Sequence, residues 1–82
     1  METNRKELLK SNSLWRHFKG GVYQVLCIAN STETPENEYV VYRGVKDGKC
    51  WSRPLGMFLE RVYPDMSTEE VKERFEYIGN LL

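Results

Sequence analysis

The clearest structural signal in this chain is the stretch EYVVYRGVKDGKCWSRP, residues 38–54. Two runs rich in β-branched and aromatic residues flank the dipeptide Asp47-Gly48, a combination that predicts a β-hairpin with a two-residue type I′ turn. Pro54 ends the second run, because proline has no N–H to donate within a sheet. We therefore predict strands over residues 38–45 and 49–53.

Neighbouring segments extend this pattern. Val22 to Ala29 follows Gly20-Gly21 and predicts a strand with apolar residues on both alternating sets, which is typical of a central or strongly curled strand. Residues 57–62 predict a fourth strand. Short strands at regular spacing favour a small bent antiparallel sheet or SH3-like barrel, because 82 residues cannot supply two full sheets.

The two ends of the chain predict helix. Asn4 followed by Glu7 has the spacing of a capping box, which predicts a short helical or frayed segment in residues 1–14. Ser67 and Glu70 repeat this spacing, and three apolar side chains then share one helical face: Val71, Phe75 and Ile78. We predict a helix over residues 68–78.

These segments define the expected architecture, a single small domain of the α+β class that is mainly β. Residues 15–62 form the β core, and residues 63–82 form a C-terminal helix and tail that covers one open end of the sheet. The side chains expected in the core are Val25, Ile28, Val41, Phe58 and Val62.

Composition excludes several classes of protein. The chain has 12 basic and 12 acidic residues, two cysteines and one histidine, too few ligands for a structural zinc site or a disulfide scaffold. The longest apolar run, Val25 to Ala29, is too short to cross a membrane. Charged residues interrupt the first segment, so we expect no signal peptide and a cytoplasmic location.

Catalytic signals are weak. His17 is the only histidine, and no glycine-framed nucleophile accompanies it. Cys27 lies within an apolar strand and is expected to be a small core side chain. We predict a non-enzymatic domain with no cofactor and no metal.

The hairpin offers a candidate binding face. The two-residue turn pairs Tyr42 with Arg53 and places five side chains on one face, with Gly44 leaving room for the indole: Tyr42, Lys46, Lys49, Trp51 and Arg53. Aromatic groups interleaved with cations stack bases and follow phosphates in single-strand binders, so this face predicts weak recognition of nucleic acid or another anionic ligand. The alternative is that Trp51 and Tyr42 belong to the core, with the stem of Arg53 packed on Tyr42.

A second function class is a peptide- or protein-interaction module of SH3-like type. Aromatic grooves of such barrels bind extended peptides, and four residues are candidates to line one: Trp15, Tyr23, Tyr39 and Trp51. Binding of nucleic acid weakens steeply with salt, whereas binding in an aromatic groove does not, so salt dependence separates the two classes.

A longer pattern runs through residues 15–62. It has the form H-F-K-G-x-x-Y-x-V-L, then V-V-Y, then W-x-R-P-x-x-M-F, beginning at His17, Val40 and Trp51. This pattern resembles the bacterial domain-of-unknown-function family 1653. The resemblance implies a compact β-rich fold in a bacterial, cytoplasmic protein, with no established activity and hence no functional residues to carry over. The family has a short Pro-containing turn before an R-F pair, and Arg74-Phe75 matches that pair here. The turn itself is not matched, because residues 66–73 form a longer stretch without proline. Residues 75–78 are therefore either helix or an extended end of the sheet.

Overall fold

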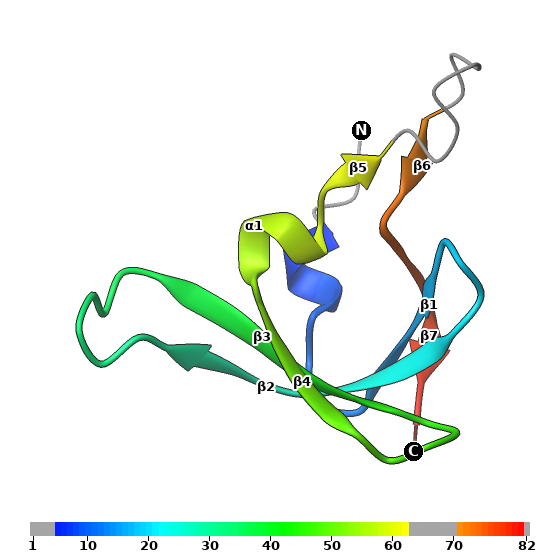
Figure 1. Cartoon of the computed structure of the whole chain (residues 1–82), viewed down its shortest axis with the longest axis horizontal. Helices are drawn as coiled ribbons and strands as arrows, with labels where there is room; N and C mark the ends of the chain where they lie inside the picture. The colour runs from blue at the N-terminus through cyan, green and yellow to red at the C-terminus, as the bar shows by residue number, and fades with distance from the viewer. Residues whose placement is uncertain (1–4, 63–70, 82) are drawn as a thin grey trace.

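The computed structural model describes residues 5–62 and 71–81. A 3-10 turn, η1 (Arg5–Leu8), precedes four strands: β1 (Ser13–His17), β2 (Val22–Asn30), β3 (Glu38–Gly44) and β4 (Cys50–Pro54). One helical turn and three further strands complete the order: α1 (Leu55–Phe58), β5 (Arg61–Val62), β6 (Lys72–Glu73) and β7 (Phe75–Asn80). The strands form an antiparallel sheet in the order β4-β3-β2-β1-β7, beside a separate β5-β6 pair (Figure 1).

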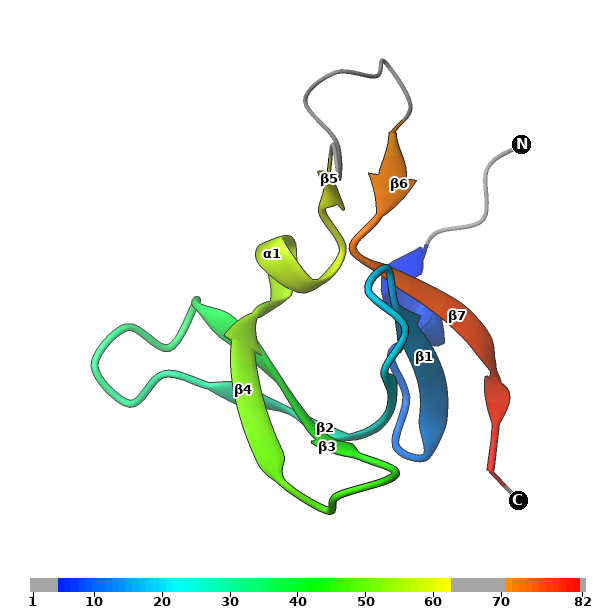
Figure 2. The ribbon, with the colours of Figure 1, turned by 45° about the vertical axis from the view of Figure 1, so that its right-hand side comes forward.

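The main sheet is strongly curled. Strands β4 and β7 lie on opposite sides of its concave interior, while α1 lies above the opening between them (Figure 2). Because β4 and β7 are its two edges, the sheet does not close into a barrel. The predicted small bent antiparallel sheet is confirmed, whereas the SH3-like assignment stays a prediction. Of the predicted N-terminal segment, residues 5–8 form the 3-10 turn η1, and residues 1–4 lie outside the described residues.

A bulge in β2 explains the apolar residues on both of its faces. Val25 pairs with Tyr42 and Cys27 pairs with Val41, so Leu26 is an extra residue on β2. A bulge of this kind reverses the alternation of side chains along the strand. Val25 is therefore buried, while Cys27 is exposed, and the prediction that Cys27 belongs to the core was wrong.

The predicted type I′ turn was wrong. The Gly44 amide donates to the Lys49 carbonyl at 2.9 Å and the Gly48 amide donates to the Gly44 carbonyl at 2.9 Å, so the loop holds four residues, 45–48. Gly48 has a φ of 74° and Asp47 does not have a positive φ, whereas a type I′ turn needs two such residues. Tyr42 consequently pairs with Trp51 instead of Arg53.

Gly44 also has a different role from the one predicted. A Cβ at this position would lie 2.4 Å from Oδ1 of Asp47, so the glycine makes room for that carboxylate and not for an indole. The same Asp47 oxygen accepts a hydrogen bond from the Lys49 amide at 3.0 Å. The loop is thus closed by a side chain as well as by the backbone.

The predicted C-terminal helix was wrong for residues 71–74, and for residues 75–78 the extended end of the sheet, left open by the sequence, is confirmed. Residues 75–80 form β7, which pairs with β1 from Ser13 opposite Asn80 to His17 opposite Phe75. Phe75 is 1% exposed and Ile78 is 37% exposed, so alternate residues and not a helical stripe face the core. Residues 68–70 of the predicted helix lie outside the described residues.

The predicted fourth strand over residues 57–62 was also wrong in its first half. Residues 55–58 form α1, which directs Phe58 into the core, and only residues 61–62 are extended, pairing with β6. The Phe58 and Phe75 rings stack with centroids 4.0 Å apart, so α1 and β7 meet across the open side of the sheet.

The core is small and mostly aromatic. Its fully or nearly fully buried side chains are Leu9, Trp15, Val25, Val40, Tyr42, Phe58 and Phe75. Of the five predicted core residues, Val25 and Phe58 are confirmed and Ile28 packs against the cluster. Val41 and Val62 are outside it; Val41 points to the outer face because its neighbours Val40 and Tyr42 point inward.

The N-terminal segment is held in place by one arginine. The Arg5 guanidinium donates to the carbonyls of Leu59 and Phe75, forms an ion pair with Glu73, and lies 5.7 Å from the centroid of a Trp15 ring. These contacts join η1 to the segments on either side of the opening. Arg5 therefore helps to hold α1 and β7 together.

Candidate functional site

The curled sheet contains a cavity of about 420 Å³ on its concave side. We call it the basic–aromatic pocket, and its lining residues are His17, Lys19, Gly21, Tyr23, Tyr42, Trp51, Arg53 and Phe75. They come from the end of β1, the β1–β2 turn, β2, β3, β4 and β7. The curvature of the sheet thus forms the pocket, because it places residues of both edge strands, β4 and β7, around the same cavity.

Aromatic side chains form the inner wall of this pocket. Tyr42 and Phe75 are 5% and 1% exposed, with ring centroids 5.5 Å apart, and Tyr23 packs edge-to-face against both. Trp51 lies directly opposite Tyr42 in the β3–β4 ladder but is 50% exposed. The structure therefore resolves the alternatives for these two residues: Tyr42 belongs to the core, and Trp51 presents a free surface beside it.

Arg53 supplies a charge at the aromatic wall. It follows Trp51 by two residues and so projects from the same face of β4. Its guanidinium carbon lies 5.8 Å from the centroid of the Phe75 ring. Its Nη1 is buried and has no hydrogen-bond partner among the described residues. A buried charged donor without a partner is costly, which makes Arg53 the most informative side chain of the pocket.

His17 lies in a cationic environment. Its Nδ1 accepts a hydrogen bond from the Lys19 amide at 3.1 Å, and its ring packs against Phe18 and Phe75. Burial, followed by the positive charges of Arg53, Arg74 and Lys19, lowers the pKa of His17 below its usual value. No carboxylate lines the basic–aromatic pocket within the described residues.

Only part of the predicted binding face is assembled at this pocket. Tyr42, Trp51 and Arg53 line it together, whereas Lys46 and Lys49 are exposed at the hairpin loop and do not line it. The predicted binding face did not include four side chains of the pocket, of which Tyr23 had been a candidate for the peptide groove: His17, Lys19, Tyr23 and Phe75. The period-two alternation of Phe75 and Tyr77 was the available signal for the inward position of Phe75.

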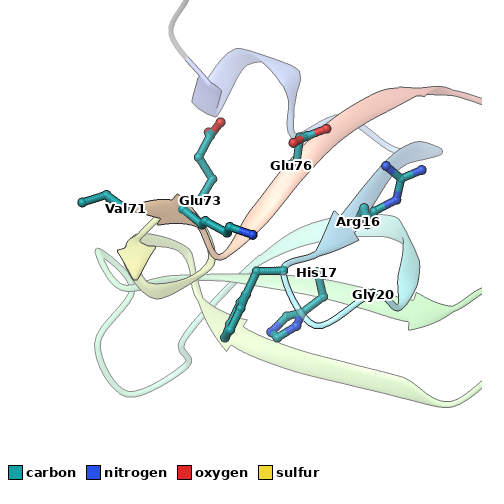
Figure 3. A pocket seen from close by; sticks show the side chains of 8 residues that line it. Arg16, His17, Gly20, Val71, Glu73 and Glu76 are labelled. Atoms are coloured by element: carbon teal, nitrogen blue, oxygen red, sulfur yellow. The ribbon is translucent and has the colours of Figure 1, made fainter. Parts of the chain in front are cut away.

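A neighbouring cavity has mixed charge. It measures about 400 Å³ and shares His17, but its lining includes Glu73 and Glu76 as well as Arg16 and Lys72 (Figure 3). A third cavity, of about 410 Å³ beside Pro54, is lined by Glu36 and Glu38. Acidic side chains thus line both of these cavities but not the basic–aromatic pocket.

The predicted peptide groove loses one of its walls. Trp15 is completely buried, and its Nε1 donates to Oγ of Ser13 at 3.0 Å, so it cannot contact a peptide at the surface.

Within residues 5–62 and 71–81, no three His, Cys, Asp or Glu side chains converge as metal ligands. The described helical segments are also too short to span a bilayer.

Comparison with known proteins identifies one relationship. No curated protein and no solved structure matched the chain. A family model described as "Protein of unknown function (DUF1653)" matches residues 13–77, which include β1 to β4 and every residue of the basic–aromatic pocket. On this match, which covers most of the sequence, the chain belongs to the DUF1653 family.

Proposed function

We propose that this domain binds single-stranded nucleic acid weakly, with the basic–aromatic pocket as its main contact. The observation that carries the proposal is Arg53, whose buried Nη1 lacks a partner in the described part of the chain, beside the exposed indole of Trp51. A base stacking on Trp51 would gain about 1–3 kcal/mol. The arginine would donate to a phosphate oxygen, the acceptor that suits a guanidinium best.

The charges around the pocket support an anionic ligand. Lys19 and Arg53 line the cavity, and none of the ion pairs found among the described residues involves either of them. Lys46 and Lys49 add positive charge at the exposed hairpin loop, from which they would attract a flexible strand. Since the whole chain has no net charge, attraction must come from this local cluster, and weak binding is expected.

An amide NMR titration with short single-stranded RNA and DNA tests the proposal. We expect saturable shifts on residues 17–23 and 50–53, fading as the salt concentration rises. Trp51→Ala and Arg53→Met should each weaken binding. Arg43→Met is the matched control, because Arg43 is exposed on the neighbouring strand and does not line the pocket. Absence of shifts at low salt would overturn the proposal.

An amide NMR titration with an extended peptide in place of the oligonucleotides tests the alternative of a peptide-interaction module. The observation that favours it is that β4 is an edge of the described sheet and β7 is the other, because edge strands can pair with an extended peptide. Shifts caused by an unrelated extended peptide, concentrated along β4 and insensitive to salt, would support that module instead.

A further inference from the structure

The cations of the basic–aromatic pocket come from opposite sides of the opening. Arg53 is on β4, while His17 and Lys19 are at the end of β1 and in the following turn, three positions away in the sheet order. The curl of the sheet brings them around one cavity. Below them the buried rings of Tyr42 and Phe75 close the pocket.

The charge at this site exceeds what one phosphodiester supplies. Lys19 and Arg53 contribute two positive charges that no described carboxylate pairs with. The nearby Arg74 forms an ion pair through Nη2, which lies 3.3 Å from Oε2 of Glu60, although its Nε is buried without a described partner. A phosphate monoester carries about −1.5 to −2 charges near neutral pH and three acceptor oxygens, whereas an internal phosphodiester carries one charge.

Hydrogen-bond donors around the pocket match that chemistry. Arg53 lines the pocket with a guanidinium that carries five N–H donors, of which those on Nη1 are buried without a described partner. Nδ1 of His17 accepts the Lys19 amide, so the neutral ring carries its proton on Nε2, which is a donor. The ammonium of Lys19 adds donors from the turn. Three side chains therefore offer donors, and among the described lining residues no acidic group competes for them.

We propose, building on the nucleic-acid function above, that the basic–aromatic pocket receives the terminal phosphate monoester of a nucleotide. Arg53 and Lys19 contact the phosphate, and the base stacks on the exposed indole of Trp51. The cavity of about 420 Å³ is within the usual range for small-ligand sites, which start at roughly 300 Å³. A free mononucleotide and the phosphorylated end of a strand share this chemistry.

Calorimetric titration with a matched set of probes tests this inference. The probes are one short oligonucleotide bearing a 5′-phosphate, the same oligonucleotide bearing a 3′-phosphate, the same one with hydroxyl ends, adenosine 5′-monophosphate and adenosine. We expect at least one phosphorylated end to bind about tenfold or more tightly than hydroxyl ends, as one additional charge-assisted hydrogen bond predicts. Arg53→Met should abolish this preference, whereas Arg43→Met should retain it.

The outcomes separate this inference from the proposed function. Equal binding of all three oligonucleotides would overturn the terminal-phosphate inference and leave single-strand binding intact. No binding by any oligonucleotide or mononucleotide would overturn both. Binding of adenosine 5′-monophosphate as tight as that of the phosphorylated oligonucleotide, with none by adenosine, would support the inference and identify the free mononucleotide as a sufficient ligand.

Discussion

Arg53 links the stability of the folded domain to its proposed function. Its Nη1 is buried without a described partner, and its guanidinium lies over Phe75 at 5.8 Å. Replacing Arg53 with methionine keeps an unbranched side chain against the ring and removes the charge. Removing the unpartnered donor should raise the free energy of unfolding by about 1–3 kcal/mol, while losing the cation–π contact should lower it by about 0.5–1 kcal/mol. The net expectation is a stabilisation of about 1 kcal/mol.

Thermal and urea unfolding measure this effect. For a domain of this size about 1 kcal/mol corresponds to a rise in Tm of about 4–8 °C. Inorganic phosphate should raise the Tm of the natural protein and have no effect on Arg53→Met, because a ligand that binds only the folded state stabilises it. The variant should therefore be more stable in dilute buffer and unresponsive to the anion.

The matched control is Arg43→Met on the adjacent strand. Arg43 donates from Nε to Oε1 of Gln24 at 3.0 Å, so its loss should cost up to about 1 kcal/mol. The response of that variant to phosphate should remain. If Arg53→Met were less stable than the natural protein by more than about 1 kcal/mol, the arginine would stabilise the curled sheet, and its unpartnered donor would not carry the expected cost.

Three further predictions test the fold and its electrostatics. Phe75→Ala should lower the free energy of unfolding in urea by about 3–5 kcal/mol, and Ile78→Ser should lower it by less than about 0.5 kcal/mol. The difference is expected because the two residues face opposite sides of β7. Equal losses would favour a shared helical face. Gly44→Ala should destabilise the domain by about 1–2 kcal/mol, because the Cβ of the alanine would meet the Asp47 carboxylate. The destabilisation should be smaller in an Asp47→Ala background. A double-mutant cycle in which the effects of the two substitutions added fully would contradict this prediction. His17 has a lowered pKa in the folded state, so the unfolded chain binds more protons: stability should be complete above about pH 6.5 and fall as the pH drops through the folded-state pKa. Unfolding at a series of pH values should show this loss, and a similar loss in His17→Gln would assign it to other groups.

The strands of the hairpin could be predicted from sequence, but their register could not. Asp47-Gly48 marked the turn correctly, and the actual loop is longer because only Gly48 has a positive φ. The partner of Tyr42 consequently moved from Arg53 to Trp51, a shift of two residues. Side chains alternate with a period of two, so an even shift leaves each residue on its predicted face. For this reason the grouping of Tyr42, Trp51 and Arg53 survived an incorrect register.

The C-terminal segment shows where local patterns were insufficient. Val71, Phe75 and Ile78 fit a helical stripe, and Phe75, Tyr77 and Gly79 fit an alternating strand equally well. The structure selects the strand because β1 offers a ladder to it, with His17 opposite Phe75. This partner lies 58 residues earlier in the chain, and no spacing within residues 63–82 encodes it. Tertiary pairing thus overrode a plausible local preference.

The same long-range pairing determines how much of the site was accessible to prediction. The basic–aromatic side chains of β4 are close in sequence, so the hairpin pattern grouped Trp51 with Arg53. His17 and Phe75 join them only because β1 pairs with β7 and the sheet curls toward β4. The lowered pKa of His17 arises mainly from its burial and then from charges on three separate segments, those of Arg53, Arg74 and Lys19. Phe75 is the residue by which β7 lines the pocket, and its ring contacts both His17 and Arg53, so anion binding and the docking of β7 should be thermodynamically coupled.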